Sequence, residues 1–96
     1  MADLRLVSTR EHQLKPLVEA ALTNEIRLTE AGIRRTEQRL LEFEKKYDLG
    51  TQDFIARYEN DEMKETIDFD EWIGEFRLLG RLREKVDIIK DVRFAN

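Results

Sequence analysis

The amino-acid sequence predicts an all-α fold: a long antiparallel helical hairpin of coiled-coil type, with a short connecting helix, that dimerises into a four-helix bundle. Apolar residues recur every seven positions along residues 22–47, a spacing typical of a packed helical seam. Only one proline and four glycines interrupt the 96 residues, which favours long helices over a many-stranded sheet. Charged residues make up 40% of the chain, where about a quarter is usual, and the two signs are interspersed as on solvated helix faces.

The chain divides into an N-terminal arm, residues 1–15, and a single helical hairpin domain, residues 16–96. Pro16 suits the first turn of a helix, because backbone N–H groups in that turn have no acceptor within the helix and proline lacks this group. No strong breaker follows until Gly50, which we expect to end the helix in the left-handed conformation. The first helix therefore spans about residues 16–48, or roughly 48 Å at 1.5 Å per residue.

The heptad pattern identifies the residues that should lie between the two long helices. Thr29 and Thr36 also fall in this seam, where they would fill narrow layers with hydroxyls bonded back to the preceding turn. The seam positions of both helices are Leu22, Ile26, Ile33, Leu40, Phe43, Tyr47, Trp72, Phe76, Leu79, Leu82, Val86 and Ile89.

Two further helices are predicted, at about residues 52–59 and 69–93. Asp68, with Glu71 three positions later, resembles a capping box, and Ile67 and Trp72 have the spacing of a hydrophobic staple. Two glycines inside the last helix, at positions 74 and 80, indicate a close approach of another helix.

Several apolar residues lie off the seam of the hairpin, namely Leu28, Leu41, Ile73, Leu78 and Ile88. Two helices cannot bury all of these rows at once. A second copy of the chain would cover them, so we expect a homodimer.

Composition makes several function classes poor candidates. The chain has no cysteine and a single histidine, His12, so neither a thiolate metal site nor a histidine cluster can form, and we expect no metal and no cofactor. No nucleophile with a neighbouring base is recognisable, so we expect a protein that is not an enzyme. The absence of long apolar stretches leads us to expect a cytoplasmic protein without membrane contact.

The densest polar feature is an acidic run between the second and last helices: Glu59, Asp61, Glu62, Glu65, Asp68, Asp70 and Glu71. One interpretation is a solvated turn whose acids favour helix N-termini. The other is an acidic patch that docks on a basic partner surface, such as the phosphate-binding groove of a ribonuclease. The candidate partner-binding residues are Glu62, Glu65, Asp70 and Glu71 for charge, with Leu14, Leu17 and Val18 as an apolar strip beyond the end of the hairpin.

Residues 42–85 carry a pattern that resembles a known family. The motifs are Phe43-Glu44-Lys45-Lys46-Tyr47, Thr51-Gln52-Asp53-Phe54, Tyr58-Glu59, Asp68-Phe69-Asp70-Glu71-Trp72 and Arg81-Leu82. They are similar to those of small prokaryotic helical proteins encoded beside small toxin genes, the antitoxin partners of TumE-type toxins. The chain departs from the family in having Asp48 where glycine usually follows the tyrosine, and Lys64-Glu65-Thr66 in place of a Gly-Asp-Asp turn.

The resemblance implies an antitoxin or regulator that neutralises a small basic protein, such as a toxin, by occluding its active surface. It supplies no catalytic residue. Two alternatives stay open: a structural coiled-coil module that only oligomerises or bridges other proteins, and a DNA-binding regulator that uses Arg77, Arg81, Arg83 and Lys85 on the last helix. The net charge of −4 disfavours nucleic acid as a partner.

Overall fold

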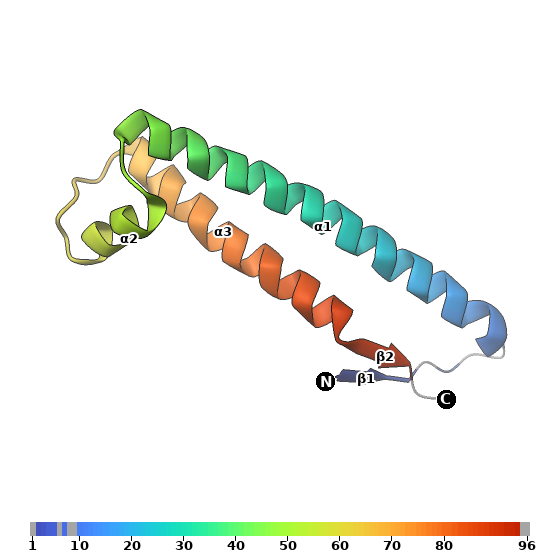
Figure 1. Cartoon of the computed structure of the whole chain (residues 1–96). Helices are drawn as coiled ribbons and strands as arrows, with labels where there is room; N and C mark the ends of the chain where they lie inside the picture. The colour runs from blue at the N-terminus through green and yellow to red at the C-terminus, as the bar shows by residue number, and fades with distance from the viewer. Residues whose placement is uncertain (1, 6, 8–9, 95–96) are drawn as a thin grey trace.

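The computed structural model describes residues 2–5, 7 and 10–94 as a long helical hairpin (Figure 1). Two long helices, α1 and α3, run antiparallel, α2 packs across the end where the hairpin turns, and two short strands lie at the other end. The molecule measures 58 × 22 × 18 Å. The elements are β1 (Ala2–Leu4), α1 (Glu11–Tyr47), α2 (Thr51–Glu59), α3 (Ile67–Lys90) and β2 (Val92–Phe94).

Helix α1 begins at Glu11, before the predicted start near Pro16, so much of the predicted arm is helical. The amides of Gln13 and Leu14 both donate to the carbonyl of Arg10, which closes a turn ahead of the proline. Pro16 lies inside the helix and removes only one i→i−4 hydrogen bond. Its position near the N-terminus of a long helix makes that loss tolerable.

The C-terminus of α1 differs from the prediction that Gly50 is the left-handed residue. Asp48 takes the left-handed conformation, with φ 49° and ψ 49°, and its N–H donates to the carbonyl of Glu44. Gly50 has an ordinary extended conformation, with φ −68° and ψ 147°. An aspartate tolerates left-handed backbone because its short polar side chain can bond locally.

The predicted cap and staple of the last helix are wrong. Thr66 is the N-cap of α3, and its hydroxyl oxygen accepts from the amide of Phe69 at 3.0 Å. Since the helix starts at Ile67, Asp68 lies inside the first turn and its carboxylate bonds to α1 instead. Ile67 is 78% exposed while Trp72 is fully buried, so the two form no staple.

Two short strands lie at the end of the hairpin opposite α2. Helix α3 ends at Lys90, before the predicted end at residue 93, and the chain continues as β2. Strand β2 pairs in parallel with β1, in the register Ala2 to Val92 and Leu4 to Phe94. The sequence indicated an N-terminal arm over residues 1–15 but neither of the two strands.

The seam positions lie between α1 and α3, and none of them is exposed. Leu40, Phe43, Trp72, Leu79 and Val86 are buried, and the other predicted seam residues are half-buried. Thr29 and Thr36 are buried in the same seam, and the hydroxyl of Thr29 donates to the carbonyl of Glu25 at 2.8 Å. The prediction of an all-helical hairpin built on this heptad pattern is therefore confirmed.

Helix α2 covers one of the apolar residues that lie off the predicted seam. Ile73 is buried in one cluster with Phe54 and Ile55 of α2, so it needs no second copy. Leu28, Leu41 and Ile88 are still about half exposed or more.

The two glycines of α3 do not mark a close approach of helices within the chain. A Cβ placed on Gly74 or Gly80 would meet no heavy atom within 4 Å. Both glycines face open space on the single chain, so the expected close approach of another helix is not found within the hairpin. No helix in the described part of the chain is both long enough and apolar enough to span a bilayer.

Candidate protein-binding surface

A stack of aromatic rings fixes the turn end of the hairpin, where α1, α2 and α3 meet. The indole of Trp72 lies almost parallel to the ring of Phe54, with centroids 4.0 Å apart and planes at 5°. The indole also stacks on the rings of Phe43 and Tyr47, with centroid separations of 5.5 Å and 5.9 Å. Stacked aromatic pairs each contribute about 0.5–1.5 kcal/mol beyond the burial of their area. This cluster holds the chain on both sides of the acidic run in place.

Buried polar groups around Trp72 are satisfied within the chain. The indole Nε1 donates to the hydroxyl of Thr51 at 3.1 Å, and the Thr51 amide donates to the carboxylate of Glu44 at 2.8 Å. Thr51 is the first residue of α2, and Gly50 is the N-cap without a side-chain bond. The Glu44 carboxylate therefore takes over part of the capping of α2.

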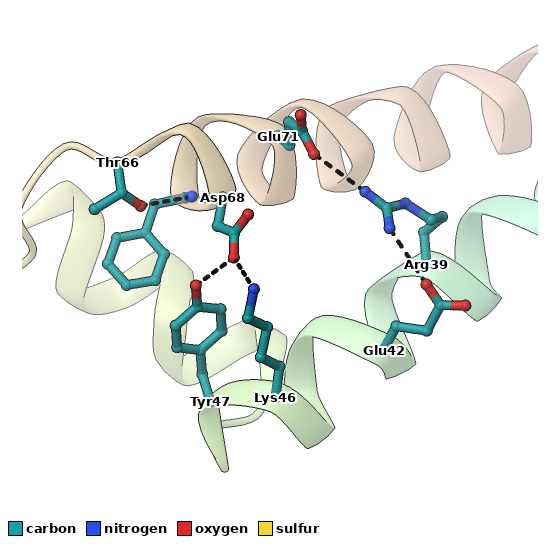
Figure 2. A network of polar contacts seen from close by, with 8 residues as sticks. Arg39, Glu42, Lys46, Tyr47, Thr66, Asp68 and Glu71 are labelled. Atoms are coloured by element: carbon teal, nitrogen blue, oxygen red, sulfur yellow. Dashed lines mark hydrogen bonds and ion pairs between the residues drawn. The ribbon is translucent and has the colours of Figure 1, made fainter.

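Asp68 joins the start of α3 to the end of α1, as Figure 2 shows. Its carboxylate accepts from Lys46 Nζ at 2.6 Å and from the hydroxyl of Tyr47. Two hydrogen bonds hold the pKa of Asp68 below its usual value: the bond from Lys46 has the larger effect and the bond from Tyr47 the smaller. The same bonds to Asp68 raise the pKa of Tyr47 and of Lys46 above their usual values. Asp68 is therefore a structural carboxylate and not a free docking group.

Glu71, one of the four predicted docking carboxylates, is also engaged within the chain. The guanidinium of Arg39 bridges Glu71 of α3, at 3.1 Å, and Glu42 of its own helix, at 3.3 Å (Figure 2). These groups are about half exposed, so the bridge contributes little to stability. It does occupy the Glu71 carboxylate, which makes this residue a weaker candidate for partner binding than predicted.

The remaining predicted carboxylates form the core of a free acidic surface. We name residues 59–70 the acidic turn. Within it Glu62, Glu65 and Asp70 are exposed and make no ion pair among the described residues, and the same holds for Glu59 and Asp61. Asp61 has φ 57°, a left-handed conformation that folds the turn back after α2. Lys64 is the one cation in this stretch of sequence.

The net charge of the chain is concentrated at the turn end. Residues 45–70 carry eight carboxylates and four cations, a net charge of −4. This equals the net charge of the whole chain, so the thirteen cations and thirteen carboxylates outside this segment cancel. Residues 45–70 include the end of α1, all of α2 and the start of α3, which lie together at the turn end (Figure 1).

The predicted apolar strip lies at the opposite end of the molecule. Leu14, Leu17 and Val18 are on the first turns of α1, where Leu17 is 68% exposed and the other two are half-buried. Because α1 runs the length of the hairpin, the strip and the acidic turn are at opposite ends of a molecule 58 Å long (Figure 1). The structure thus separates the two groups of predicted partner-binding residues into two different surfaces.

A shallow groove of about 300 Å³ lies beside the turn end, between α1, α3 and the start of α2. Its lining combines the apolar side chains of Leu40, Phe76 and Leu79 with the charged groups of Glu44 and Arg83. Glu44 accepts from Thr51, and Arg83 pairs with Glu37 at 3.0 Å. Asp53 also lines the groove and is exposed. The groove has room for one side chain of a docked protein, and no reactive group is arranged in it.

The basic residues of α3 divide into paired and unpaired groups. Arg83 pairs with Glu37, and Lys85 pairs with Glu25 across the seam at 2.5 Å. Arg77 and Arg81 are exposed and make no ion pair among the described residues. The salt bridges to α1 show that half of the predicted basic track serves the hairpin itself.

The described residues contain no group of three or more histidine, cysteine, aspartate or glutamate side chains placed to hold a metal ion. His12, which was predicted to lie in an arm, is exposed in the first turn of α1.

Sequence reasoning missed the bonds that build the surface, namely Asp68 with Lys46 and Trp72 with Thr51. Each pair is more than 20 residues apart in the chain. No local spacing signals such pairs. Comparison with models of protein families, with curated proteins and with solved structures found no match for this chain.

Proposed function

We propose that this protein is a non-enzymatic protein-binding module whose acidic turn docks on a basic surface of a partner protein. One observation carries the proposal: the whole net charge of −4 is concentrated in residues 45–70, and five exposed carboxylates of the acidic turn make no ion pair within the described residues. Charges of one sign gathered on one surface steer a partner of opposite sign and fix its orientation.

The packing of the turn end also supports a docking role. Rings from all three helices pack on Trp72, and the charges next to them, such as Asp68, are held by bonds across the hairpin. A rigid surface loses little conformational entropy on binding, so more of the interaction energy appears as affinity.

The resemblance of residues 42–85 to antitoxin partners of TumE-type toxins supports a more specific form of the proposal. In that form the partner is a small basic toxin, and the acidic turn covers its cationic active surface. Inhibition then acts by steric and electrostatic occlusion and requires no catalytic group in this chain.

We also propose that the protein is a homodimer. Leu28 and Ile88 stay 60% and 58% exposed on the single hairpin, and they belong to the surplus that led to the expectation of a four-helix bundle. Exposed apolar rows of this kind are covered when two copies associate.

Purification of the tagged protein from its own host at low ionic strength tests the proposal. We expect a small basic protein to be recovered at a fixed ratio and to be released by added salt, because screening weakens exposed charge contacts. Recovery of the protein alone supports the structural alternative, a module that only oligomerises. Recovery of DNA that is lost steeply with salt supports the DNA-binding alternative.

A further inference from the structure

The two long helices differ in length, which leaves one end of the hairpin open. Helix α1 has 37 residues and α3 has 24. At 1.5 Å per residue the difference is about 20 Å of helix without a helical partner. We name this the open end: it consists of the first turns of α1, the last turns of α3, and strands β1 and β2 (Figure 1).

The open end, together with Val7 between β1 and α1, carries three of the six exposed large apolar side chains of the described residues. Val7 is 86% exposed, Leu17 is 68% exposed, and Ile88 of the last turns of α3 is 58% exposed. Leu28 lies eleven residues after Leu17, which is close to three helical turns, so both leucines lie on the same face of α1. An apolar face of this kind at the end of a helix pair favours contact with another protein surface.

The small sheet at the open end is itself incomplete. It has two parallel strands of three residues each, and each strand has one strand neighbour among the described residues. A two-stranded sheet is at best marginally stable in water, and three or more strands are normally needed. The outer edges present backbone N–H and C=O groups that a further strand can pair with.

Charge decides which partner fits this surface. Outside residues 45–70 the positive and negative charges cancel, so two open ends do not repel each other through net charge. Two turn ends do repel, because each holds the net charge of −4. A second copy of the chain is therefore best placed when the open ends meet and the turn ends point apart.

We propose that the open end is the interface between two copies, with the outer strand edges paired across a two-fold axis and the faces of Leu17 and Leu28 packed together. This inference rests on the proposed homodimer and replaces a fully overlapping four-helix bundle with an end-to-end arrangement. A two-fold axis brings the same surface of both copies together and makes the joined strands antiparallel.

This arrangement gives the dimer two separate acidic surfaces. Each turn end lies about 28 Å of helix beyond Leu28 and points away from the interface, so both are free to dock a partner at the same time. The dimer then binds two partner molecules, one at each end.

Matched substitutions on α1 test the position of the interface. Leu17→Glu places a charge at the open end, and Leu41→Glu places the same charge at an exposed leucine near the turn end. By light scattering on a size-exclusion column, the unaltered protein and Leu41→Glu should show twice the chain mass of 11.5 kDa. Leu17→Glu should show the mass of one chain, with an unchanged helical circular dichroism spectrum as evidence that it folds.

Single-cysteine labelling tests the orientation, because the natural chain has no cysteine. Donor- and acceptor-labelled copies are mixed with the dye at Gln13→Cys, in the open end, or at Glu62→Cys, in the acidic turn. We expect strong energy transfer at position 13 and very little at position 62, because the two turn ends of the dimer point away from each other.

The outcomes separate this inference from the proposals on which it rests. A dimer with strong transfer at position 62, or one that Leu41→Glu also dissociates, overturns the open-end interface while the homodimer stands. A monomer at all concentrations overturns both of these proposals. Docking of a basic protein on the acidic turn is measured independently and can survive either result.

Discussion

Trp72 donates from its indole nitrogen to the hydroxyl of Thr51 at 3.1 Å, and both side chains are buried. This bond joins the first turns of α3 to the first residue of α2. The two helices flank the acidic turn, so the bond fixes the two ends of the surface on which the proposed function depends.

Replacement of Thr51 by valine should destabilise the protein by about 1–3 kcal/mol. Valine has nearly the same shape but no oxygen, which leaves the buried indole N–H without an acceptor. Thr51→Ser keeps the acceptor and should cost less. Urea unfolding monitored by tryptophan fluorescence measures both variants, and equal stability of Thr51→Val and the unaltered protein would show that the bond is not important.

Asp48→Gly should stabilise the protein by about 1 kcal/mol. Asp48 has φ 49°, where glycine has no steric cost, and its negative charge lies at the C-terminus of α1, where it opposes the helix dipole. Asp48→Asn removes only the charge and should recover part of the gain.

Gly50 provides the control for this prediction. It has φ −68°, and a Cβ there would meet its nearest neighbour, an Asp53 oxygen, at 3.9 Å. Gly50→Ala should therefore leave the thermal midpoint unchanged or slightly raised. A large loss would place the left-handed residue at Gly50, as the sequence alone suggested.

Gly74→Ala and Gly80→Ala should each stabilise α3 by about 0.5–1 kcal/mol, the usual difference between the two residues inside a helix. Neither new methyl group would meet another atom within 4 Å on the single chain. Thermal unfolding at low protein concentration measures the effect. A loss of stability that appears only at high concentration would reveal that a second copy packs on these positions.

Asp68→Asn should lower the stability of the protein most between about pH 5 and 9, and less at acidic and alkaline pH. The pKa of Asp68 is lowered in the folded state, so its contribution is present above the unfolded value of about 3.9 and disappears as pH falls through the lower folded pKa. The pKa values of Tyr47 and Lys46 are raised, so their contribution is present below about pH 10 and disappears as pH rises through the folded values.

The urea midpoint measured against pH tests this linkage. The unaltered protein should exceed Asp68→Asn by a constant margin between about pH 5 and 9, and the margin should shrink on both sides. A margin that does not change from pH 3 to pH 11 would mean that the three groups are not coupled.

The heptad pattern was sufficient to predict the hairpin because helical packing depends on a short, regular spacing. Leu40, Phe43 and Trp72 could be placed in the seam for this reason, and all three are buried. Where two polar residues competed for one role, the sequence was less informative. Thr66 and Asp68 are both good N-cap residues, and the choice depends on Lys46 and Tyr47, which approach Asp68 only in the folded chain.

The parts of the surface that join distant segments could not be predicted from spacing. Strand β2 pairs with β1 across almost the full length of the chain, and three residues carry too little pattern to reveal a strand. The charge of the acidic turn could be predicted from the sequence, but which of its carboxylates have no ion pair could not. Glu71 is paired with Arg39 while Glu62 and Glu65 are free, and only the packing of α1 on α3 decides this difference.

The most direct test of the acidic docking surface compares two double variants with the same change in charge. Glu62→Lys/Glu65→Lys reverses two free carboxylates of the acidic turn, and Glu84→Lys/Asp87→Lys reverses two exposed, unpaired carboxylates of α3 outside it. Both variants change the net charge from −4 to 0.

The measurement is the affinity of each variant for the basic protein recovered from the host, by titration calorimetry at low ionic strength. We expect Glu62→Lys/Glu65→Lys to bind at least about tenfold more weakly, which corresponds to about 1.4 kcal/mol. We expect Glu84→Lys/Asp87→Lys to bind nearly as tightly as the unaltered protein. Equal affinity of both variants would contradict the claim that the acidic turn is the docking surface.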